Sequence, residues 1–117
     1  MEILVVDDNQ DICQLVESIL ISEGYDVKAC CDPLKFESMI KDKKPKLIIT
    51  DLMMSGIDGR ALTRKIKENP DTEKIKIMMM SAHPDAEELS AKVNIDDFLT
   101  KPFEIEELVK KVEFLLQ

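Results

Sequence analysis

The sequence has 117 residues, of which 44% are hydrophobic, and this is enough to build one compact domain around a single core. Acidic residues outnumber basic residues by 24 to 16, and the net charge of −8 argues against non-specific nucleic-acid binding and against anionic membranes. No apolar run approaches the ~20 residues that a membrane-spanning helix needs. We therefore expect no direct nucleic-acid partner and no membrane partner.

The cysteines Cys13, Cys30 and Cys31 lack the spacing of a zinc site, and an odd number of unpatterned thiols fits a reducing compartment. We expect them to be small core residues. The sequence enters an apolar stretch at Ile3 without a basic leader or a cleavage site, so no signal peptide is predicted. Together these features predict a cytoplasmic protein.

Hydrophobic patterning predicts strands and helices that alternate five times along the chain. The strands are expected at residues 3–6, 25–30, 46–51, 75–80 and 97–100. The helices are expected at residues 10–23, from 32 to about 44, 59–69, 84–94 and 105–115. Asp8 or Asn9 can cap the first helix, and Asp32 can cap the second, with proline at its first helical position. Gly24 and Asn94 are expected to end helices in the left-handed conformation.

This alternation fixes the predicted fold class, because short connections and right-handed crossovers produce a parallel sheet with helices on both faces. We therefore predict an α/β fold. The sequence contains no repeats, low-complexity runs or linkers. We expect residues 1–117 to form one domain with no second domain attached.

Polar side chains stand at the carboxyl ends of four of the predicted strands. They are Asp7 with Asp8, then Asp51, Ser81 and Lys101. Parallel strands place all their carboxyl ends at one edge of the sheet, where open α/β sheets bind their ligands. Topology therefore predicts that these groups lie together, although Asp51 taken alone could simply be a turn residue.

Three carboxylates held close together repel one another unless a cation neutralises them. A set of oxygen ligands without histidine or cysteine suits Mg²⁺, which also keeps waters and binds phosphate oxygens. Lys101 adds a positive charge and Ser81 a hydroxyl donor, and together with the metal they match the oxygens of a phosphoryl group. Asp51 is left as a nucleophile that could form an aspartyl phosphate.

The chain resembles the receiver domain of two-component response regulators over its whole length. The matching features are Val5-Val-Asp-Asp8, Asp51 at the end of the third strand, Ser81-Ala82, and Phe98-Leu-Thr-Lys-Pro-Phe103. Each feature is weak alone, but in this order and at this spacing they are highly specific. The resemblance is to single-domain receivers of the chemotaxis-regulator kind, which are phosphoacceptors and not enzymes beyond their own phosphorylation and dephosphorylation.

The resemblance implies roles for individual residues. Asp51 would be the phosphoacceptor. A Mg²⁺ ion would be held by Asp7, Asp8, Asp51 and the backbone carbonyl of Met53. The phosphoryl ligands would be Ser81 and Lys101, and the conformational switch would be made by Ser81 and Phe98.

The resemblance also implies a flavodoxin-like (βα)5 three-layer sandwich with strand order 2-1-3-4-5 and a cis peptide bond between Lys101 and Pro102. The phosphodonor would be a sensor histidine kinase or a histidine phosphotransfer protein. An unidentified downstream protein would bind the face formed by the fourth helix, fifth strand and fifth helix. The chain would be a monomer or a weak phosphorylation-dependent dimer.

Three positions depart from the usual pattern of the family. Ser55 stands where proline is usual, Asn94 stands where glycine is common, and Phe98 stands where tyrosine is frequent. The loop after Asp51 could therefore be looser, and Asn94 would itself have to adopt a positive φ. No residue of the phosphorylation set is missing.

Other functions remain open at this point. A phosphatase similar to the haloacid dehalogenases needs a second aspartate two residues after the nucleophile, where this chain has Met53. A flavin carrier needs hydroxyls, glycines and amides after the first strand, where Asp7 and Asp8 would repel phosphate. An adaptor that is never phosphorylated is disfavoured by the complete acidic and lysine set. The chain could also be a receiver cut from a larger response regulator or hybrid kinase.

Overall fold

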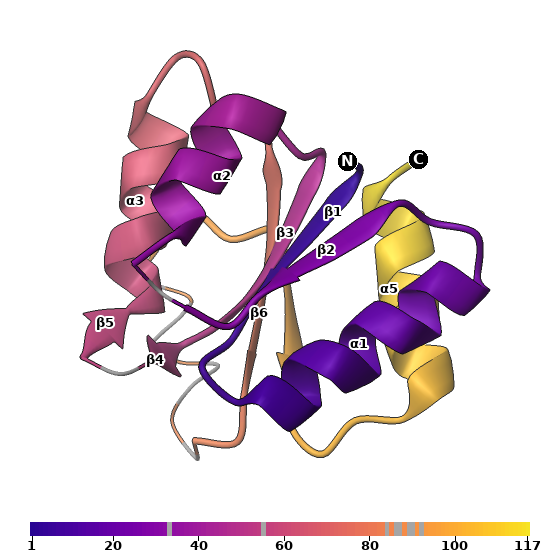
Figure 1. The fold of residues 1–117 in the computed structure, drawn as a ribbon. Coiled ribbons are helices and arrows are strands. Elements are labelled where there is room, and N and C mark those ends of the chain that lie inside the picture. Colours follow the sequence, from indigo (N-terminus) through magenta and orange to yellow (C-terminus); the bar gives the residue numbers. More distant parts are fainter. Residues whose placement is uncertain (33, 55, 84, 86–87, 89–90, 92) are drawn as a thin grey trace.

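A computed structural model describes residues 1–32, 34–54, 56–83, 85, 88, 91 and 93–117. Its centre is a five-stranded parallel sheet in the order β2-β1-β3-β6-β7 (Figure 1). These strands are Ile3–Val6 (β1), Val27–Cys30 (β2), Leu47–Asp51 (β3), Lys76–Ser81 (β6) and Asp97–Thr100 (β7). A separate two-stranded hairpin, β4-β5, accounts for the gap in the numbering. Counted without that hairpin, the order is 2-1-3-4-5, so the predicted topology is confirmed.

Of the helices that the structure describes, two cover each face of this sheet. The helices are α1 (Gln10–Ser22), α2 (Phe36–Lys43), α3 (Gly59–Glu68) and α5 (Ile105–Leu115). One face is covered by α1 and α5, and the other by α2 and α3 (Figure 1). The predicted three-layer α/β sandwich is therefore confirmed. The helix predicted over residues 84–94 falls largely outside the described residues.

The core is divided between the two faces because successive strand residues point in opposite directions. Ile3 and Val5 pack with α1 and α5, whereas Leu4 and Val6 pack with α2 and α3. All four are fully buried. Strands covered on both faces read as continuous apolar runs, and this is why the sequence pattern located them well.

The first helix begins and ends as the sequence indicates. The Asn9 side chain accepts hydrogen bonds from the backbone amides of Asp11 and Ile12, so Asn9 is the cap of α1. Gly24 has a φ of 94° and follows the end of the helix. Leu15, an apolar residue of this helix, is 48% exposed.

The predicted start of α2 is wrong. The helix begins at Phe36, and its N-cap residue Lys35 makes no side-chain capping bond. Asp32 instead forms a turn ahead of the helix, since its carboxylate accepts from the Leu34 amide and its carbonyl accepts from the Lys35 amide. An aspartate that can cap a helix can equally cap a turn, and the sequence does not distinguish the two.

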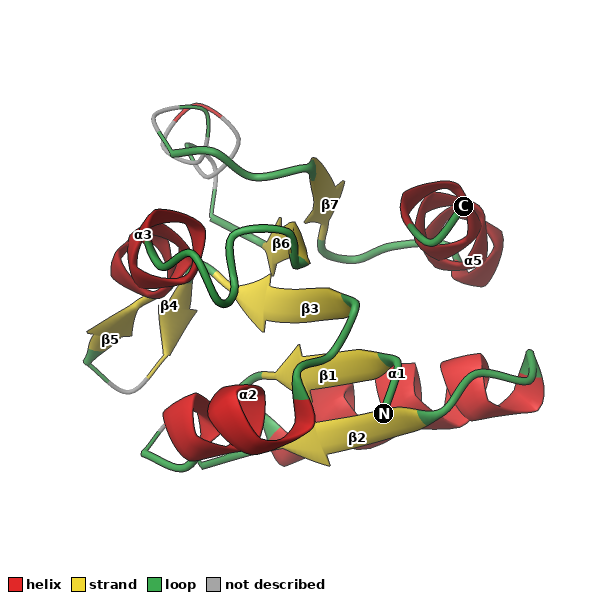
Figure 2. Cartoon of the chain, turned by 90° about the horizontal axis from the view of Figure 1, so that it is seen from above, coloured by secondary structure: helices red, strands yellow, loops and turns green. Residues whose placement is uncertain are grey.

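Two further expectations are corrected. The segment after Asp51 was expected to be a loop, but it contains the antiparallel strands β4 (Met53–Met54) and β5 (Ile57–Asp58), which lie beside α3 (Figure 2). Among the described residues, the only non-glycine with a positive φ is Lys44, at 43°. Asn94 therefore does not adopt the left-handed conformation expected of it. None of the helices that the structure describes is long and apolar enough to cross a membrane.

Candidate functional site

Three carboxylates meet at the carboxyl edge of the sheet. Asp7 and Asp8 follow β1, and Asp51 ends the neighbouring strand β3. One carboxylate oxygen from each of the three lies within 4.8 Å of the others. Asp7 is fully buried, Asp51 is half-buried and Asp8 is exposed, so the cluster runs from the core to the surface. The structure thus brings together the acidic residues that the strand pattern placed at one edge.

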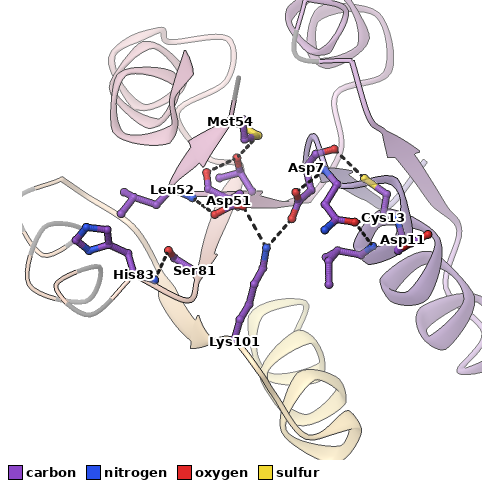
Figure 3. A network of polar contacts seen from close by, with 12 residues as sticks. Asp7, Asp11, Cys13, Asp51, Leu52, Met54, Ser81, His83 and Lys101 are labelled. Atoms are coloured by element: carbon purple, nitrogen blue, oxygen red, sulfur yellow. Dashed lines mark hydrogen bonds and ion pairs between the residues drawn. The ribbon is translucent and has the colours of Figure 1, made fainter. Parts of the chain in front are cut away.

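Lys101 reaches this cluster from the segment after β7. Its ammonium donates hydrogen bonds to Asp7 Oδ2 over 2.8 Å and to Asp51 Oδ2 over 3.1 Å (Figure 3). Its backbone amide donates to the Ser81 carbonyl, which fixes the segment against the end of β6. The Lys101-Pro102 peptide bond is cis, as the resemblance implies. The ammonium therefore lies between two of the three carboxylates.

The environment shifts the pKa of both Asp51 and Lys101. Burial raises the pKa of Asp51 above its ordinary value, and the charge and hydrogen bond of Lys101 offset this only in part. For Lys101, burial lowers the pKa, but the hydrogen bond to Asp7 and the charges of Asp51 and Asp7 outweigh it, so the net shift is upward. The lysine is therefore held as a cation, while the Asp51 carboxylate is desolvated.

The backbone around Asp51 is held by Leu52 and Gly59. The Leu52 amide donates to Asp51 Oδ1 over 2.7 Å, and the Leu52 carbonyl accepts from the Gly59 amide over 2.6 Å. A β-carbon at Gly59 would collide with the Asp51 carbonyl oxygen and lie 3.0 Å from that of Leu52. From the sequence, Gly59 was expected only to begin a helix. A glycine eight residues after a candidate nucleophile was the available signal for this close approach.

Ser81 lies at the end of β6, next to the strand that carries Asp51. It is 6% exposed, and its hydroxyl oxygen accepts a hydrogen bond from the His83 backbone amide over 3.0 Å (Figure 3). The hydroxyl is thus engaged with the following loop in this structure.

The predicted metal carbonyl belongs to the residue after Leu52, and the predicted switch aromatic packs against the Leu52 side chain. Met53 pairs with Asp58 in the β4-β5 hairpin, directly after the Asp51 strand, and its side chain is 55% exposed. Phe98 is half-buried in β7 and packs with Ile95 against the buried side chains of Leu52 and Met79. Phe98 is thus linked to the Asp51 region through one buried leucine.

Asp7 is held from the side opposite Lys101. Its carboxylate accepts from the Asn9 amide over 2.9 Å, and its carbonyl accepts from the Cys13 thiol over 3.1 Å (Figure 3). Burial, followed by interactions with Cys31, raises the pKa of the Cys13 thiol above its usual range. Cys13 and Cys30 are buried as expected, but Cys31 is exposed. It follows the last residue of β2, where the chain leaves the sheet.

The donor set of this edge fits a hard divalent cation. The three carboxylates offer oxygen ligands only, and one of them is exposed to solvent. Among the residues that the structure describes, no other group of three or more histidine, cysteine, aspartate or glutamate side chains could hold a metal. An acidic cluster next to a lysine and a hydroxyl can bind a phosphoryl group together with a cation.

The chain matches a protein-family model over nearly its whole length. The family model for the response regulator receiver domain matches residues 3–113. Regulatory protein VanRB of Enterococcus faecalis is 34% identical over 119 residues, which cover 100% of this chain and 53% of VanRB. The DNA-binding dual master transcriptional regulator RpaA of Synechocystis is 32% identical over 98% of this chain and 48% of its own length. The chain thus spans about half the length of these curated relatives.

Solved structures agree in fold. The crystal structure of the receiver domain of NtrX from Brucella abortus superposes with a TM-score of 0.89 and 33% sequence identity. The match covers 98% of both chains. The likeness therefore extends over the sheet and all the described helices.

Proposed function

Because the chain belongs to the family of response regulator receiver domains, we propose that it is a signalling switch that accepts a phosphoryl group on the Asp51 carboxylate. Two-component signalling is the family's setting, and its receiver domains are phosphoacceptors that interact with histidine kinases and downstream effectors. The donor proposed here is a histidine kinase or a histidine phosphotransfer protein. The chain itself promotes the transfer and the later hydrolysis, and acts on no other substrate.

One observation carries this proposal: the Lys101 ammonium lies between the Asp7 and Asp51 carboxylates, 2.8 and 3.1 Å away. A nucleophilic carboxylate beside a fixed cation is suited to phosphoryl transfer, because charge on the phosphoryl oxygens is stabilised where it develops. An Asp51 oxygen forms the new bond to phosphorus as the bond to the donor breaks. The Lys101 ammonium then exchanges its contact with Asp51 for one with a phosphoryl oxygen.

The metal in this proposal is Mg²⁺, held by Asp7, Asp8, Asp51 and the Met53 carbonyl. When bound, it supplies positive charge that relieves the repulsion among the carboxylates and binds phosphoryl oxygens. The gradient of exposure supports this assignment, since buried Asp7 is anchored by Asn9 while Asp8 faces solvent. A partly hydrated ion fits such an edge better than an enclosed cage does.

The switch in this proposal begins at Ser81. The Ser81 hydroxyl leaves the His83 amide, 3.0 Å away, and donates to a phosphoryl oxygen on Asp51. This moves the loop at His83, and the Phe98 ring rotates inward beside Leu52. The changed surface includes β7 and α5, together with the helix predicted over residues 84–94, which falls largely outside the described residues. A downstream protein binds this surface, either on a monomer or on a weak phosphorylation-dependent dimer.

The proposal is tested by incubating the chain with Mg²⁺ and a small phosphodonor and measuring its intact mass. Addition of one phosphoryl group is expected for the wild type and for Asp58→Asn, but not for Asp51→Asn. Asp58 is a suitable control because it lies on the same side of the sheet and caps α3, and asparagine caps equally well. Equal uptake by the wild type and Asp51→Asn would refute the phosphoacceptor assignment. No uptake by any form would favour an adaptor that is never phosphorylated.

A further inference from the structure

The three cysteines lie around the ends of β1 and β2, close to the acidic site. Cys13 is in the first turns of α1, and its sulfur lies 3.1 Å from the Asp7 carbonyl oxygen and 3.9 Å from the Cys30 carbonyl oxygen. The latter oxygen belongs to the peptide group that leads directly into Cys31. The Cys31 backbone thus directly follows a carbonyl group whose oxygen lies 3.9 Å from the Cys13 sulfur.

The two faces of the sheet decide which thiols can meet. Cys13 packs in the cluster beneath α1 and α5, whereas Cys30 packs in the cluster beneath α2 and α3. The Cys30 thiol is also engaged elsewhere, since it donates to the Asp32 carbonyl over 3.1 Å. Cys31 is the next residue after β2, and continuing the alternation of the strand by one position would direct its side chain toward the face that holds Cys13. The Cys13 thiol accordingly interacts with the Cys31 side chain.

Cys13 and Cys31 differ in their exposure to solvent. Cys13 is fully buried, whereas Cys31 is exposed and lies beyond the last hydrogen-bonded residue of β2. An oxidant in solution therefore meets Cys31 first. The buried thiol beside it can then attack the oxidised sulfur. An exposed cysteine next to a resolving cysteine is the arrangement found at redox-sensitive sites.

We propose that Cys13 and Cys31 are a modification site, at which a hydroperoxide converts the two thiols into a reversible disulfide bond. The Cys31 sulfur attacks the peroxide, the O–O bond breaks, and the products are a Cys31 sulfenic acid and water or an alcohol. The Cys13 sulfur then attacks the sulfenic sulfur, which forms the S–S bond and releases water made from the hydroxyl group and the Cys13 proton. Two electrons pass from the thiols to the peroxide, and a low-molecular-weight thiol returns them.

The disulfide changes the surroundings of Asp7. In the reduced chain the Cys13 thiol donates to the Asp7 carbonyl, and a disulfide sulfur has no proton to donate. The carbonyl loses a buried partner one residue before Asp8, within the segment that supplies two of the three clustered carboxylates. This consequence rests on the proposed function, whereas formation of the disulfide does not.

The experiment treats the full chain with hydrogen peroxide, blocks the remaining thiols with an alkylating reagent under denaturing conditions, and measures intact and peptide masses. The wild type is expected to lose two hydrogen atoms, to keep one alkylated thiol at Cys30 and to give a Cys13–Cys31 linked peptide. Cys30→Ser is the matched control and should still form the disulfide. Cys31→Ser and Cys13→Ser should not, and the exposed position of Cys31 makes its variant a minimal change to the fold. A linkage through Cys30, or no intramolecular disulfide, would overturn the proposal.

A second measurement tests the effect on the acidic site. The rise in melting temperature with added Mg²⁺ is compared before and after peroxide treatment. We expect a smaller rise after oxidation in Cys30→Ser and no change in Cys31→Ser. Disulfide formation without any effect on the metal response would overturn the coupling to Asp7. A chain that shows no metal response in either state would refute the proposed metal site while leaving the mass result intact.

Discussion

The Lys101 ammonium donates a hydrogen bond to the Asp51 carboxylate over 3.1 Å, and yet the pKa of Asp51 is raised. Burial of the carboxylate is the larger effect, and the nearby charge of Asp7 adds to it. The folded chain therefore holds the Asp51 proton to a higher pH than the unfolded chain does. In the absence of metal, ionised Asp51 opposes folding, and its functional position has a cost in stability.

The first prediction follows from the sign of this shift. A raised pKa favours the folded state fully below the unfolded-state pKa, and this contribution is lost as pH rises through the folded-state value. Asp51→Asn, which is neutral at every pH, should therefore melt at a higher temperature than the wild type at neutral pH without Mg²⁺. The difference should shrink as the pH falls. Thermal melts across the acidic to neutral range provide the measurement.

Asp58 is the control, because its pKa shifts in the opposite direction to that of Asp51. Hydrogen bonds from Arg60 lower the pKa of Asp58, so its contribution is present above the unfolded-state pKa and is lost as pH falls. Asp58→Asn should therefore melt slightly lower than the wild type at neutral pH. If Asp51→Asn lowered the melting temperature as Asp58→Asn does, burial would not be the dominant influence on Asp51.

The second prediction concerns metal binding. Mg²⁺ should stabilise the chain by mass action, by about 2.7 kcal/mol when the free metal is about a hundred times the Kd. In Asp8→Asn, the same rise in melting temperature should require a higher Mg²⁺ concentration, because one of three clustered carboxylates loses its charge. Melting temperatures measured against Mg²⁺ concentration give the result. The control is Asp26→Asn, which removes a charge at the amino ends of β1 and β2, whereas the acidic cluster lies at the carboxyl ends. An identical metal response in the two variants would argue against Asp8 as a ligand.

The third prediction concerns the close approach at Gly59. Gly59→Ala places a methyl group against the backbone of Asp51 and Leu52, and overpacking of this kind typically costs about 1–3 kcal/mol. Because the displaced backbone carries the nucleophile, phosphate uptake should slow as well. Denaturant unfolding and intact-mass time courses measure the two effects.

The control for Gly59→Ala is Gly24→Ala, which should strain the backbone without causing a steric collision. Gly24 has a φ of 94°, but nothing lies within 4 Å of an added β-carbon there. We expect this variant to lose stability and to keep the wild-type rate of phosphate uptake, since Gly24 lies beyond the far end of α1. A similar slowing in both variants would show that general destabilisation accounts for the Gly59 result.

The fourth prediction concerns the switch. Phe98→Ala should leave phosphate uptake largely intact and should weaken the phosphorylation-dependent change over residues 81–103. The reason is that the ring packs against the apolar side chains of Leu52 and Met79. Amide hydrogen exchange on the unmodified and phosphorylated forms gives the measurement. Phe114→Ala, which removes a ring that is 72% exposed, is the control. Equal protection before and after phosphorylation in the wild type would refute the switch.

Much of the sheet could be predicted from the sequence because its strands are buried on both faces. Continuous apolar runs such as Ile3–Val6 have few other interpretations, and parallel topology then places Asp7 and Asp51 at one edge. The polar ends of those runs therefore located the acidic cluster before any coordinates. What topology alone could not give is the position of the Lys101 ammonium between two particular carboxylates, which depends on side-chain packing.

The remaining differences come from short elements and from local alternatives. Two-residue strands such as Met53–Met54 carry no readable period, so the β4-β5 hairpin was taken for a loop. Asp32 has the chemistry of a helix cap but serves a turn, and the chain around Asn94 needs no left-handed residue. The exposure of Cys31 depends on where β2 ends, and element boundaries are the least predictable feature of a sequence.

The contact between Lys101 and Asp7 joins residues that are 94 positions apart in the chain. The face of the sheet beneath α1 is likewise completed by side chains from β7 and α5, among them Leu99, Leu108 and Val112. During synthesis, Asp7, Asp8 and Asp51 leave the ribosome well before the lysine that completes their surroundings. A half-made chain consequently carries the proposed phosphoacceptor without the Lys101 ammonium and without a closed core. The proposed site is therefore complete only once nearly all of the domain has been made.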